Sequence, residues 1–308
     1  MNALSASLAD YLMMRRALGY RLVRTEKLLE QFTDFLTQRG STTVTLADAL
    51  DWARLPAGAD PSWWAHRLSV VRSFASYLHT LDPVTQVPPR DLLPSGHPRA
   101  CPYLYTEQEI TDLLAATGML RWPLRAATYR TLVGLLAVTG MRVGEAIGLD
   151  RTDIDLGRGL LVVRVGKFGK SRELPLHPST TKALGAYLRV RDRLCPQAST
   201  PAVFISTAGT RLLYCNVHWT WQRLTKHTGL VPRTSACRPR IHDLRHSFAV
   251  RSLLDAYATG EDGQRRLTLL STYLGHVDPA GTYWYLSASP ELLALAGQRL
   301  EQHLAGRS

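Results

Sequence analysis

The residues best suited to do chemistry are concentrated in positions 240–246, which read Arg-Ile-His-Asp-Leu-Arg-His. Apolar residues at helical spacing follow this stretch, so we expect it to open a helix with one buried face. His242, Arg245 and His246 are three and four positions apart, and one side of the first two turns can therefore carry all three. The start of a helix also favours an anion, because unbonded backbone N–H groups and the positive end of the helix dipole lie there. The pattern fits either an anion-binding site or a solvated helix face.

Two other stretches carry groups that would complement this one. Arg142 opens a short predicted helix after a glycine turn, and Glu145, three residues on, is the natural partner for its guanidinium. This pair fits either a structural ion pair or an active site. Positions 166–170 form the turn of a predicted β-hairpin, with Lys167 and Lys170 at its tip. These lysines are either simply solvated or able to deliver an ammonium group into a groove.

The elements that must position these groups are mostly helical. Thr106 begins a capping box that opens a helix. Positions 126–138 are apolar on nearly all sides, which predicts a central helix. The hairpin is expected from the β-prone residues 160–165 and the alternating residues 172–176. We also expect helices at 180–193 and 217–227, a helix ended by Gly275 with His276 just beyond it, an amphipathic helix at 290–304 and a short strand at 202–205.

The first part of the chain is predicted to be a small, basic, all-helical domain. Apolar residues at helical spacing run through positions 3–39, Thr45 is placed to cap a short third helix, and a fourth helix follows position 61. Arginines and lysines line the polar faces, and Arg67 and Arg72 are expected to point outward. The charge favours a DNA clamp over an ordinary helical bundle.

Length and proline content suggest how the chain is divided. A chain of 308 residues is long enough for two domains, each with a core of its own. Prolines recur between positions 83 and 102 without any apolar period, which is typical of an extended linker. The expected organisation is a helical domain over residues 1–82, a linker over 83–102 and a second domain over 103–308.

Composition and charge point to a cytosolic protein with a polyanionic partner. Hydrophobic residues make up 45% and charged residues 20% of the chain, as in ordinary globular proteins. The sequence has no apolar run of membrane-spanning length and no signal-peptide pattern, and its four cysteines lack disulfide-like spacing. The net charge of +12 comes mostly from arginine, which suits bidentate phosphate contacts. DNA or RNA is a better match for this charge than a membrane surface.

Read together, these stretches resemble the tyrosine recombinase (phage integrase) family, and most of all its Xer-type and transposon- or plasmid-borne members. Five motifs occur in the family's order across the second domain. They are Thr-Gly-Met-Arg-Val-Gly-Glu, Gly-Lys-x-x-Lys, His-Asp-Leu-Arg-His, Leu-Gly-His and a tyrosine nine residues after the last histidine. The resemblance implies a mainly α-helical fold with a small antiparallel β-sheet: an N-terminal helical (SAM-like) core-binding domain and a C-terminal catalytic domain.

The resemblance also implies a role for each matching residue. Tyr285 would be the nucleophile, and Tyr283, two residues before it, the alternative. Lys167 would protonate the leaving 5′ oxygen, with Lys170 as the competing lysine, and both lysines would contact DNA. The remaining implied catalytic residues are Arg142, His242, Arg245 and His276, with Glu145 supporting Arg142 and both arginines contacting DNA.

By the same resemblance, the protein is a site-specific DNA recombinase or integrase of a mobile element. It would cleave and rejoin DNA through a 3′-phosphotyrosyl intermediate, with no metal, ATP or other cofactor. Its partners would be double-stranded DNA at specific recombination sites and three further copies in a homotetramer, or related recombinases, with the C-terminal helix packed in cis or exchanged in trans. It would act in the cytoplasm, at the nucleoid when bound to DNA, and not at a membrane.

Three other functions compete with this one. A zinc enzyme is suggested by the i, i+4 spacing of His242 and His246, but Asp243 replaces the glutamate of the usual motif and Arg245 would repel a cation. A catalytically silent DNA-binding protein would keep the fold without cleaving DNA. A type IB topoisomerase would share the chemistry but relax any supercoiled plasmid without exchanging strands between defined sites.

Overall fold

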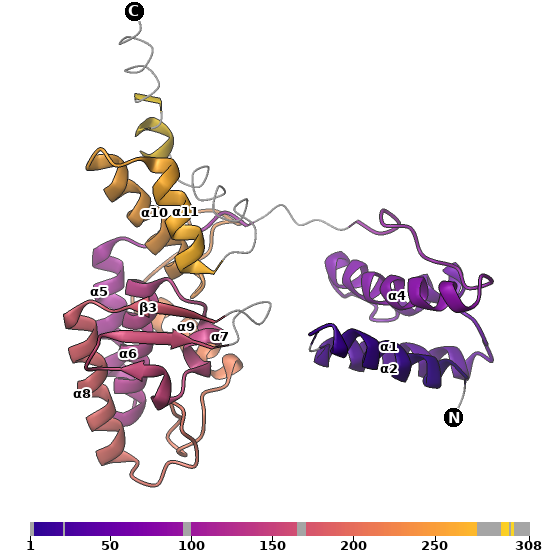
Figure 1. Ribbon diagram of the computed structural model, residues 1–308, viewed down its shortest axis with the longest axis horizontal. Coiled ribbons are helices and arrows are strands. Elements are labelled where there is room, and N and C mark those ends of the chain that lie inside the picture. Colours follow the sequence, from indigo (N-terminus) through magenta and orange to yellow (C-terminus); the bar gives the residue numbers. More distant parts are fainter. Residues whose placement is uncertain are drawn as a thin grey trace, which may run out of the picture. The chain divides into compact units, whose positions relative to one another are not determined.

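The chain forms two compact units. The computed structural model describes residues 3–20, 22–94, 100–164, 171–275, 291–295 and 297–298. Its units are Met1–Arg99 and Ala100–Ser308 (Figure 1). Each unit is described by itself. Within the described ranges, no helix is both long and apolar enough to cross a membrane.

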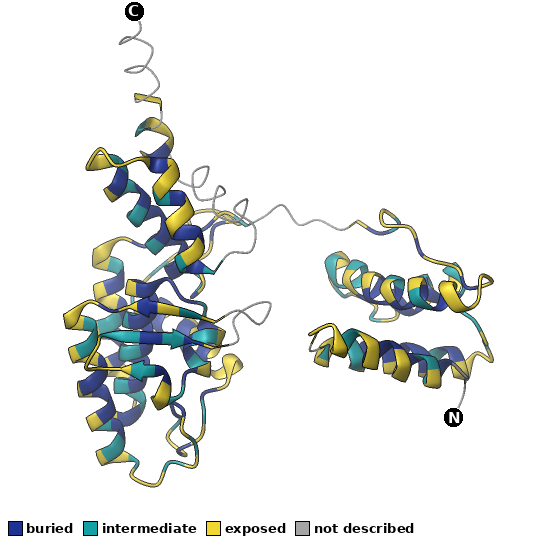
Figure 2. Ribbon diagram, viewed as in Figure 1, coloured by how far each residue is buried: buried dark blue, intermediate teal, exposed yellow. Residues whose placement is uncertain are grey.

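The first unit is a bundle of helices around an aromatic core. Phe32, Trp52 and Phe74 are almost completely buried there, and each helix has one buried and one exposed face (Figure 2). Thr45 caps the third helix by accepting a hydrogen bond from the backbone N–H of Asp48, as predicted. The helices are α1 (Ala3–Ala17), α2 (Val23–Gln38), α3 (Leu46–Arg54) and α4 (Pro61–Leu81).

Arg67 departs from the prediction that it points outward. Its side chain is buried, with the residue only 6% exposed. The guanidinium lies 3.6 Å from the centroid of the Trp52 ring and donates a hydrogen bond to the Trp52 carbonyl oxygen at 2.8 Å. An aromatic face and a carbonyl oxygen together offset the cost of burying the charge. Helical spacing alone could not show that the partner helix supplies both.

Part of the stretch assigned to a linker packs on the first unit. Thr85 and Leu93 are buried, and the backbone N–H of Gln86 donates to the Val44 carbonyl oxygen at 2.8 Å. Arg72 on α4 donates to carbonyl oxygens of this stretch, including that of Pro88 at 2.7 Å. These contacts hold residues 83–94 against the bundle, whereas an extended linker was predicted there.

The second unit combines helices with a small sheet. The sheet has the order β1-β2-β3, with both neighbouring pairs antiparallel, and Val163 faces Arg172 at the end of the β2–β3 ladder. The strands are β1 (Ile154–Asp155), β2 (Leu160–Val163) and β3 (Arg172–Pro175). The α-helices are α5 (Glu107–Ala116), α6 (Pro123–Thr139), α7 (Val143–Gly148), α8 (Pro178–Leu194), α9 (Tyr214–His227), α10 (Asp243–Ala258) and α11 (Gly263–Leu274). Short 3-10 turns follow α5 and α7, at Thr117–Met119 and Arg151–Asp153.

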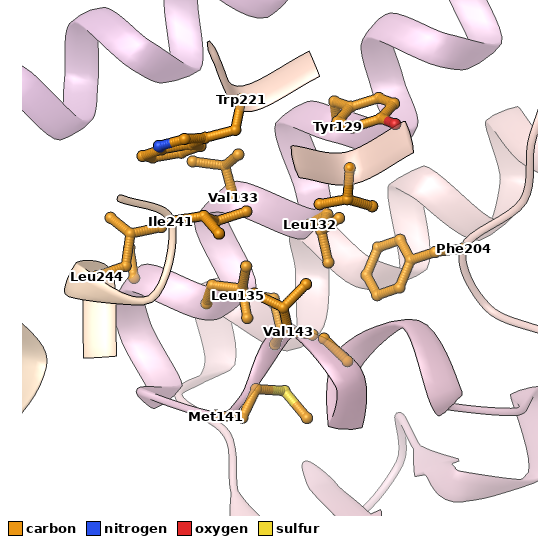
Figure 3. Close-up of a cluster of buried hydrophobic side chains, with 14 of the residues drawn as sticks. Tyr129, Leu132, Val133, Leu135, Met141, Val143, Phe204, Trp221, Ile241 and Leu244 are labelled. Atoms are coloured by element: carbon orange, nitrogen blue, oxygen red, sulfur yellow. The ribbon is translucent and has the colours of Figure 1, made fainter. Parts of the chain in front are cut away.

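Helix α6 is the centre of this unit. It contacts α5, α7, α8 and α10, and it is buried on several sides, as its all-round apolar sequence predicted. The main core gathers around it (Figure 3). Figure 3 shows that side chains from the start of α10 and from the α6–α7 turn enter this core, among them Ile241, Leu244, Met141 and Val143. The core therefore fixes the two stretches that carry the candidate site.

One predicted element of the second unit differs in the structure. Residues 202–205 are fully buried but form no regular strand, because they make only isolated bridges, such as Asp150 with Ala202. Between the two helices that follow, α10 continues to Ala258 and α11 begins at Gly263, so residues 259–262 connect them. The end of α11 at Gly275 agrees with the prediction. Of the C-terminal helix, residues 291–295 and 297–298 are described and helical.

Candidate active site

Arg142 is held in place by its chain neighbours. Helix α6 ends at Gly140, whose left-handed φ of 59° suits glycine, and an added Cβ there would lie 2.5 Å from the Phe248 ring. Met141 and Val143, on either side of Arg142, are buried in the core. The backbone of Arg142 is therefore anchored, while its side chain stays 25% exposed.

Glu145 binds both the backbone N–H and the guanidinium of Arg142. The Arg142 backbone N–H donates to Glu145 Oε2 at 2.9 Å, and the guanidinium Nη1 donates to Oε1 at 2.7 Å. The carboxylate is only 8% exposed. Burial works to raise the pKa of Glu145, but hydrogen bonds from Arg172 and Arg142 outweigh it and hold the pKa at about 2. Glu145 is therefore ionised at neutral pH and orients Arg142.

Arg172 shares this carboxylate, and no role was predicted for it from the sequence. Its Nη2 and Nη1 donate to Glu145 at 2.8 and 3.2 Å, and its Nε donates to the Tyr273 carbonyl oxygen at 2.8 Å. A signal was present, because strand alternation places Arg172 on the same face of β3 as the buried Leu174. A cation on the buried face of a strand needs a partner, and that partner is Glu145.

Arg245 lies in the first turn of α10 and is almost completely buried, with 2% exposure. Its Nη1 donates to the Gly140 carbonyl oxygen and its Nη2 to that of Leu274, both at 2.8 Å. These bonds connect α10 to the end of α6 and to the end of α11. Arg245 is therefore a structural connection between three helices as well as a candidate catalytic cation.

Three arginines converge on the end of α11, where three consecutive carbonyl oxygens accept hydrogen bonds. The acceptors are Tyr273, Leu274 and Gly275, and their respective donors are Arg172 at 2.8 Å, Arg245 at 2.8 Å and Arg142 at 3.4 Å. The last carbonyl groups of a helix have no partner within it and carry partial negative charge, so cations are favoured there. The residue that follows is His276. The site thus brings Arg142 and Arg245 to the stretch of chain that leads directly into His276.

His242 occupies the N-cap position of α10. Ile241 and Leu244 are buried beside it, while His242 itself reaches the surface. Its pKa is lowered, first by the protein that partly surrounds the ring and then by the positive charge of Arg245. A lowered pKa leaves the imidazole neutral at pH 7, so it can accept a proton. Its ring lies edge-on to that of His246, with 5.0 Å between the ring centroids.

Asp243 supports the start of α10 from inside. The carboxylate is fully buried and accepts hydrogen bonds from Arg240 Nε at 3.0 Å and Nη2 at 2.8 Å. His246 Nε2 lies 3.8 Å from the same carboxylate, which makes His246 a neighbour of this ion pair. The Tyr105 hydroxyl donates to the Arg240 carbonyl oxygen at 3.1 Å. Within the described ranges, no group of three or more potential ligand side chains could hold a metal ion.

Several predicted site residues lie outside the residues that the structure describes. They are Lys167, Lys170, His276, Tyr283 and Tyr285. The structure therefore brings together Arg142, Glu145 and Arg245, with His242 beside Arg245, and these are the predicted residues that it describes.

Comparison with known proteins identifies the family. The model of the phage integrase family matches residues 104–291, more than half of the chain. The chain is 43% identical to the putative integrase/recombinase y4rB of Sinorhizobium fredii, over 100% of both proteins. It is also 28% identical to the tyrosine recombinase XerC of Herpetosiphon aurantiacus, over 91% of this chain and 88% of the relative.

Solved structures share the fold at lower sequence identity. The Tn1549 transposon integrase in complex with a circular intermediate DNA matches with a TM-score of 0.64 and 18% identity, covering 97% of this chain and 100% of the other. The XerH recombinase bound to its difH substrate matches with a TM-score of 0.61 and 19% identity, covering 90% and 77%. The fold, the family match and the close relative agree. The chain belongs to the phage integrase family and is a tyrosine-type site-specific recombinase, an enzyme whose general chemistry is to cleave and rejoin DNA strands.

Proposed function

We propose that Arg142 and Arg245 bind the scissile phosphate of double-stranded DNA and that Tyr285 attacks it. The observation that carries this proposal is the convergence of both arginines on the end of α11, immediately before His276. A phosphodiester under attack gains negative charge on its non-bridging oxygens, and positioned cations stabilise that charge. We expect His276, the next residue along the chain, to add a hydrogen bond to the same phosphate.

The proposed steps balance in atoms and protons. The Tyr285 oxygen forms a bond to phosphorus while its proton passes to His242. The bond from phosphorus to the 5′ oxygen breaks, and Lys167 protonates that oxygen. The product is a 3′-phosphotyrosyl linkage, which keeps the energy of the phosphodiester, so a 5′ hydroxyl of a partner strand can reverse the step without ATP. The lowered pKa of His242 supports its role as proton acceptor.

Helix α9 offers a second surface for DNA. Its exposed face combines aromatic, polar and basic side chains, and four of these side chains form two stacked pairs. Arg223 lies over the Trp219 ring at 5.1 Å, and the Tyr214 and His218 rings stack at 6.5 Å between centroids. Such a face suits contacts with both phosphates and base edges. The exposed polar and aromatic residues are Tyr214, Asn216, His218, Trp219, Gln222, Arg223, Lys226 and His227.

We also propose an oligomeric state and a cellular location for the active protein. The active unit is a homotetramer on two DNA sites, with the C-terminal helix exchanged between subunits, and it acts on a mobile element in the cytoplasm, at the nucleoid. The DNA in the structures of the Tn1549 integrase, XerH and lambda integrase supports double-stranded DNA as the substrate. Light scattering of the protein with and without site DNA measures the subunit number.

Covalent trapping tests the proposed chemistry. The probe is a set of nicked duplex oligonucleotides tiled across the DNA that flanks the gene. A nick next to the cleavage site releases a short strand, so the covalent product accumulates and appears as a denaturation-resistant band. We expect adducts with the wild-type protein, none with Tyr285→Phe, and an attached peptide that contains Tyr285. The Tyr285→Phe variant should still bind the same duplexes.

Other outcomes would replace the proposal with a defined alternative. Adducts that persist in Tyr285→Phe but disappear in Tyr283→Phe would move the nucleophile to Tyr283. Duplex binding without any adduct would indicate a silent DNA-binding protein. Relaxation of supercoiled plasmids that lack the trapped site, without strand exchange, would indicate a topoisomerase.

A further inference from the structure

We propose that Arg172 is a positioning residue for DNA cleavage, which holds the Arg142 guanidinium and the chain entering His276 in one fixed arrangement. This inference rests on the proposed function, because it takes both groups to act on the same phosphate. Arg172 itself acts through Glu145 and the end of α11.

The first observation is that all three nitrogen atoms of the Arg172 side chain are used. Nη1 and Nη2 bind the two oxygens of Glu145, and Nε binds the Tyr273 carbonyl oxygen. A planar guanidinium fixes the angle between these donors, so it determines the distance from the carboxylate to the helix end as well as the two contacts. A lysine in this place could make one or two of the bonds but could not hold this geometry.

The second observation is that Glu145 is saturated. Oε1 accepts from Arg142 Nη1 and Arg172 Nη1, and Oε2 accepts from the Arg142 backbone N–H and Arg172 Nη2. An ionised carboxylate accepts about four hydrogen bonds, and here two arginines supply all four. Removal of Arg172 leaves two acceptor positions of a buried anion to be filled by something else. We expect the partly exposed Arg142, which already binds this carboxylate, to shift toward the vacated positions.

The third observation is the close approach of Arg172 to Gly275. A Cβ at Gly275 would lie 2.9 Å from Arg172 Nη1, and Gly275 has a left-handed φ of 68°. Glycine at this position therefore serves two purposes, since it ends α11 and makes room for the guanidinium. The chain just before His276 is packed against Arg172 without an intervening side chain.

The fourth observation is the place of Arg172 in the hairpin. It pairs with Val163 as the last ladder pair before positions 165–170, which include Lys167. A displacement of this end of β3 therefore moves Arg172, and with it Glu145, Arg142 and the end of α11. Through Glu145, Arg172 therefore links the end of the β2–β3 ladder to Arg142, and it keeps the distance between them constant.

The test compares variants of Arg172 with the wild-type protein on the nicked duplex that the wild-type protein cleaves. Arg172→Gln and Arg172→Lys should each reduce the single-turnover rate of adduct formation about 100-fold, because a displacement of about 1 Å in a catalytic group has an effect of that size. The dissociation constant for the same duplex should change less than about twofold, since the Arg172 side chain is only 14% exposed and its nitrogens already bind Glu145 and the Tyr273 carbonyl oxygen. The loss in Arg172→Lys, which keeps the charge, shows that the fork geometry matters.

Arg191→Gln is the matched control for a purely structural role. Arg191 is also a buried arginine, and it binds the carbonyl oxygens of Thr200 and Ala202 at 3.2 and 2.9 Å. Its loss should lower the melting temperature while leaving the adduct rate, measured well below that temperature, within about twofold of wild type. A similar reduction in rate in Arg191→Gln and Arg172→Gln would overturn the positioning role.

A double-mutant cycle separates action through Glu145 from independent damage. Because Arg172 also binds the end of α11, the variant Arg172→Gln/Glu145→Gln should cleave more slowly than Glu145→Gln alone, but its loss of rate should be much smaller than the product of the two single losses. A double variant whose loss of rate equals the product of the two single losses would overturn the inference. An unchanged rate in Arg172→Gln would also overturn it. These outcomes are distinct from failure of the proposed function, in which the wild-type protein itself would form no adduct.

Discussion

The three arginines of the site are held with very different degrees of exposure. Arg245 is 2% exposed, the Arg172 side chain 14% and the Arg142 side chain 25%. Arg245 binds backbone carbonyls at the ends of α6 and α11, whereas Arg172 and Arg142 share the carboxylate of Glu145. A buried guanidinium is costly unless every contact is made, so loss of Arg245 should affect folding as well as catalysis. Arg142 is the arginine with the most surface to offer a phosphate.

Lysine substitutions should therefore separate stability from catalysis. Arg245→Lys loses at least one of two buried hydrogen bonds and should lower the free energy of unfolding by about 3 kcal/mol. Arg142→Lys should lower it by about 1 kcal/mol, because the pair with Glu145 is partly exposed. Both should reduce adduct formation about 100-fold or more. Urea unfolding and the nicked-duplex assay measure the two effects, and equal unfolding energies would contradict this division of roles.

The carboxylate of Glu145 should make stability depend on pH in a defined direction. Its pKa is about 2 in the folded protein, against 4.5 for an unperturbed glutamate. A carboxyl with a depressed pKa contributes stability that is complete above the unfolded pKa and is lost as the pH falls through the folded one. This difference corresponds to about 3 kcal/mol. The gap in unfolding free energy between wild type and Glu145→Gln should be largest above about pH 5.5 and shrink toward pH 2, and a gap that is constant over this range would refute the ion-pair account.

At the scale of elements, the parts that were predicted well are those with local causes. Thr106 and Glu109 form the predicted capping box, with the Glu109 N–H donating to Thr106 Oγ1 at 3.1 Å and the Thr106 N–H to Glu109 Oε2 at 2.7 Å. The hairpin strands and the stop of α11 at Gly275 likewise follow from nearby residues. In the site, the Arg142–Glu145 contact is of this kind, because Arg142 is the N-cap of α7 and Glu145 is the third residue of that helix.

The features that were missed depend on contacts between distant parts of the chain. Arg172 binds Glu145, 27 positions away, and the carbonyl of Tyr273, 101 positions away. Residues 202–205 are as apolar as a buried strand, but regular pairing requires a neighbouring strand, and the part of the chain that the structure describes supplies only isolated bridges there. Arg67 is buried because another helix provides an aromatic face. Periodicity reports which face of an element is apolar but not what lies against it.

The turn from α6 to α7 should be intolerant of any side chain at Gly140. Alanine there would carry the strain of a left-handed φ, about 1–2 kcal/mol, and would also press on Phe248 and Leu274, which adds about 1–3 kcal/mol. Gly260 is the matched control, since it has a φ of 78° but no atom within 4 Å of an added Cβ. Urea unfolding should show a clearly larger loss for Gly140→Ala than for Gly260→Ala. Comparable losses would mean that the close packing contributes nothing.

At the scale of the whole molecule, the chain is strongly basic and is built from two units. The net charge is +12, and each unit has a hydrophobic core of its own. A unit with its own core is expected to fold separately. Residues 1–94 and 100–308 can therefore be prepared as separate proteins and compared with the full chain. We propose that each contributes basic side chains to the same duplex.

Salt dependence of binding measures that contribution directly. Each phosphate neutralised by lysine or arginine releases a counterion, so the logarithm of the binding constant falls linearly with the logarithm of the salt concentration, with a slope of about −0.9 per phosphate contact. If both units contact DNA, the full chain should have a steeper slope than either unit, and with about six to ten contacts its affinity for a duplex should fall about 10³- to 10⁵-fold between 50 and 200 mM salt. Fluorescence anisotropy with a fluorescein-labelled duplex gives the three slopes. A slope for the full chain equal to that of residues 100–308 alone would show that the helical unit neutralises no phosphates, and would remove the charge argument for a two-part clamp.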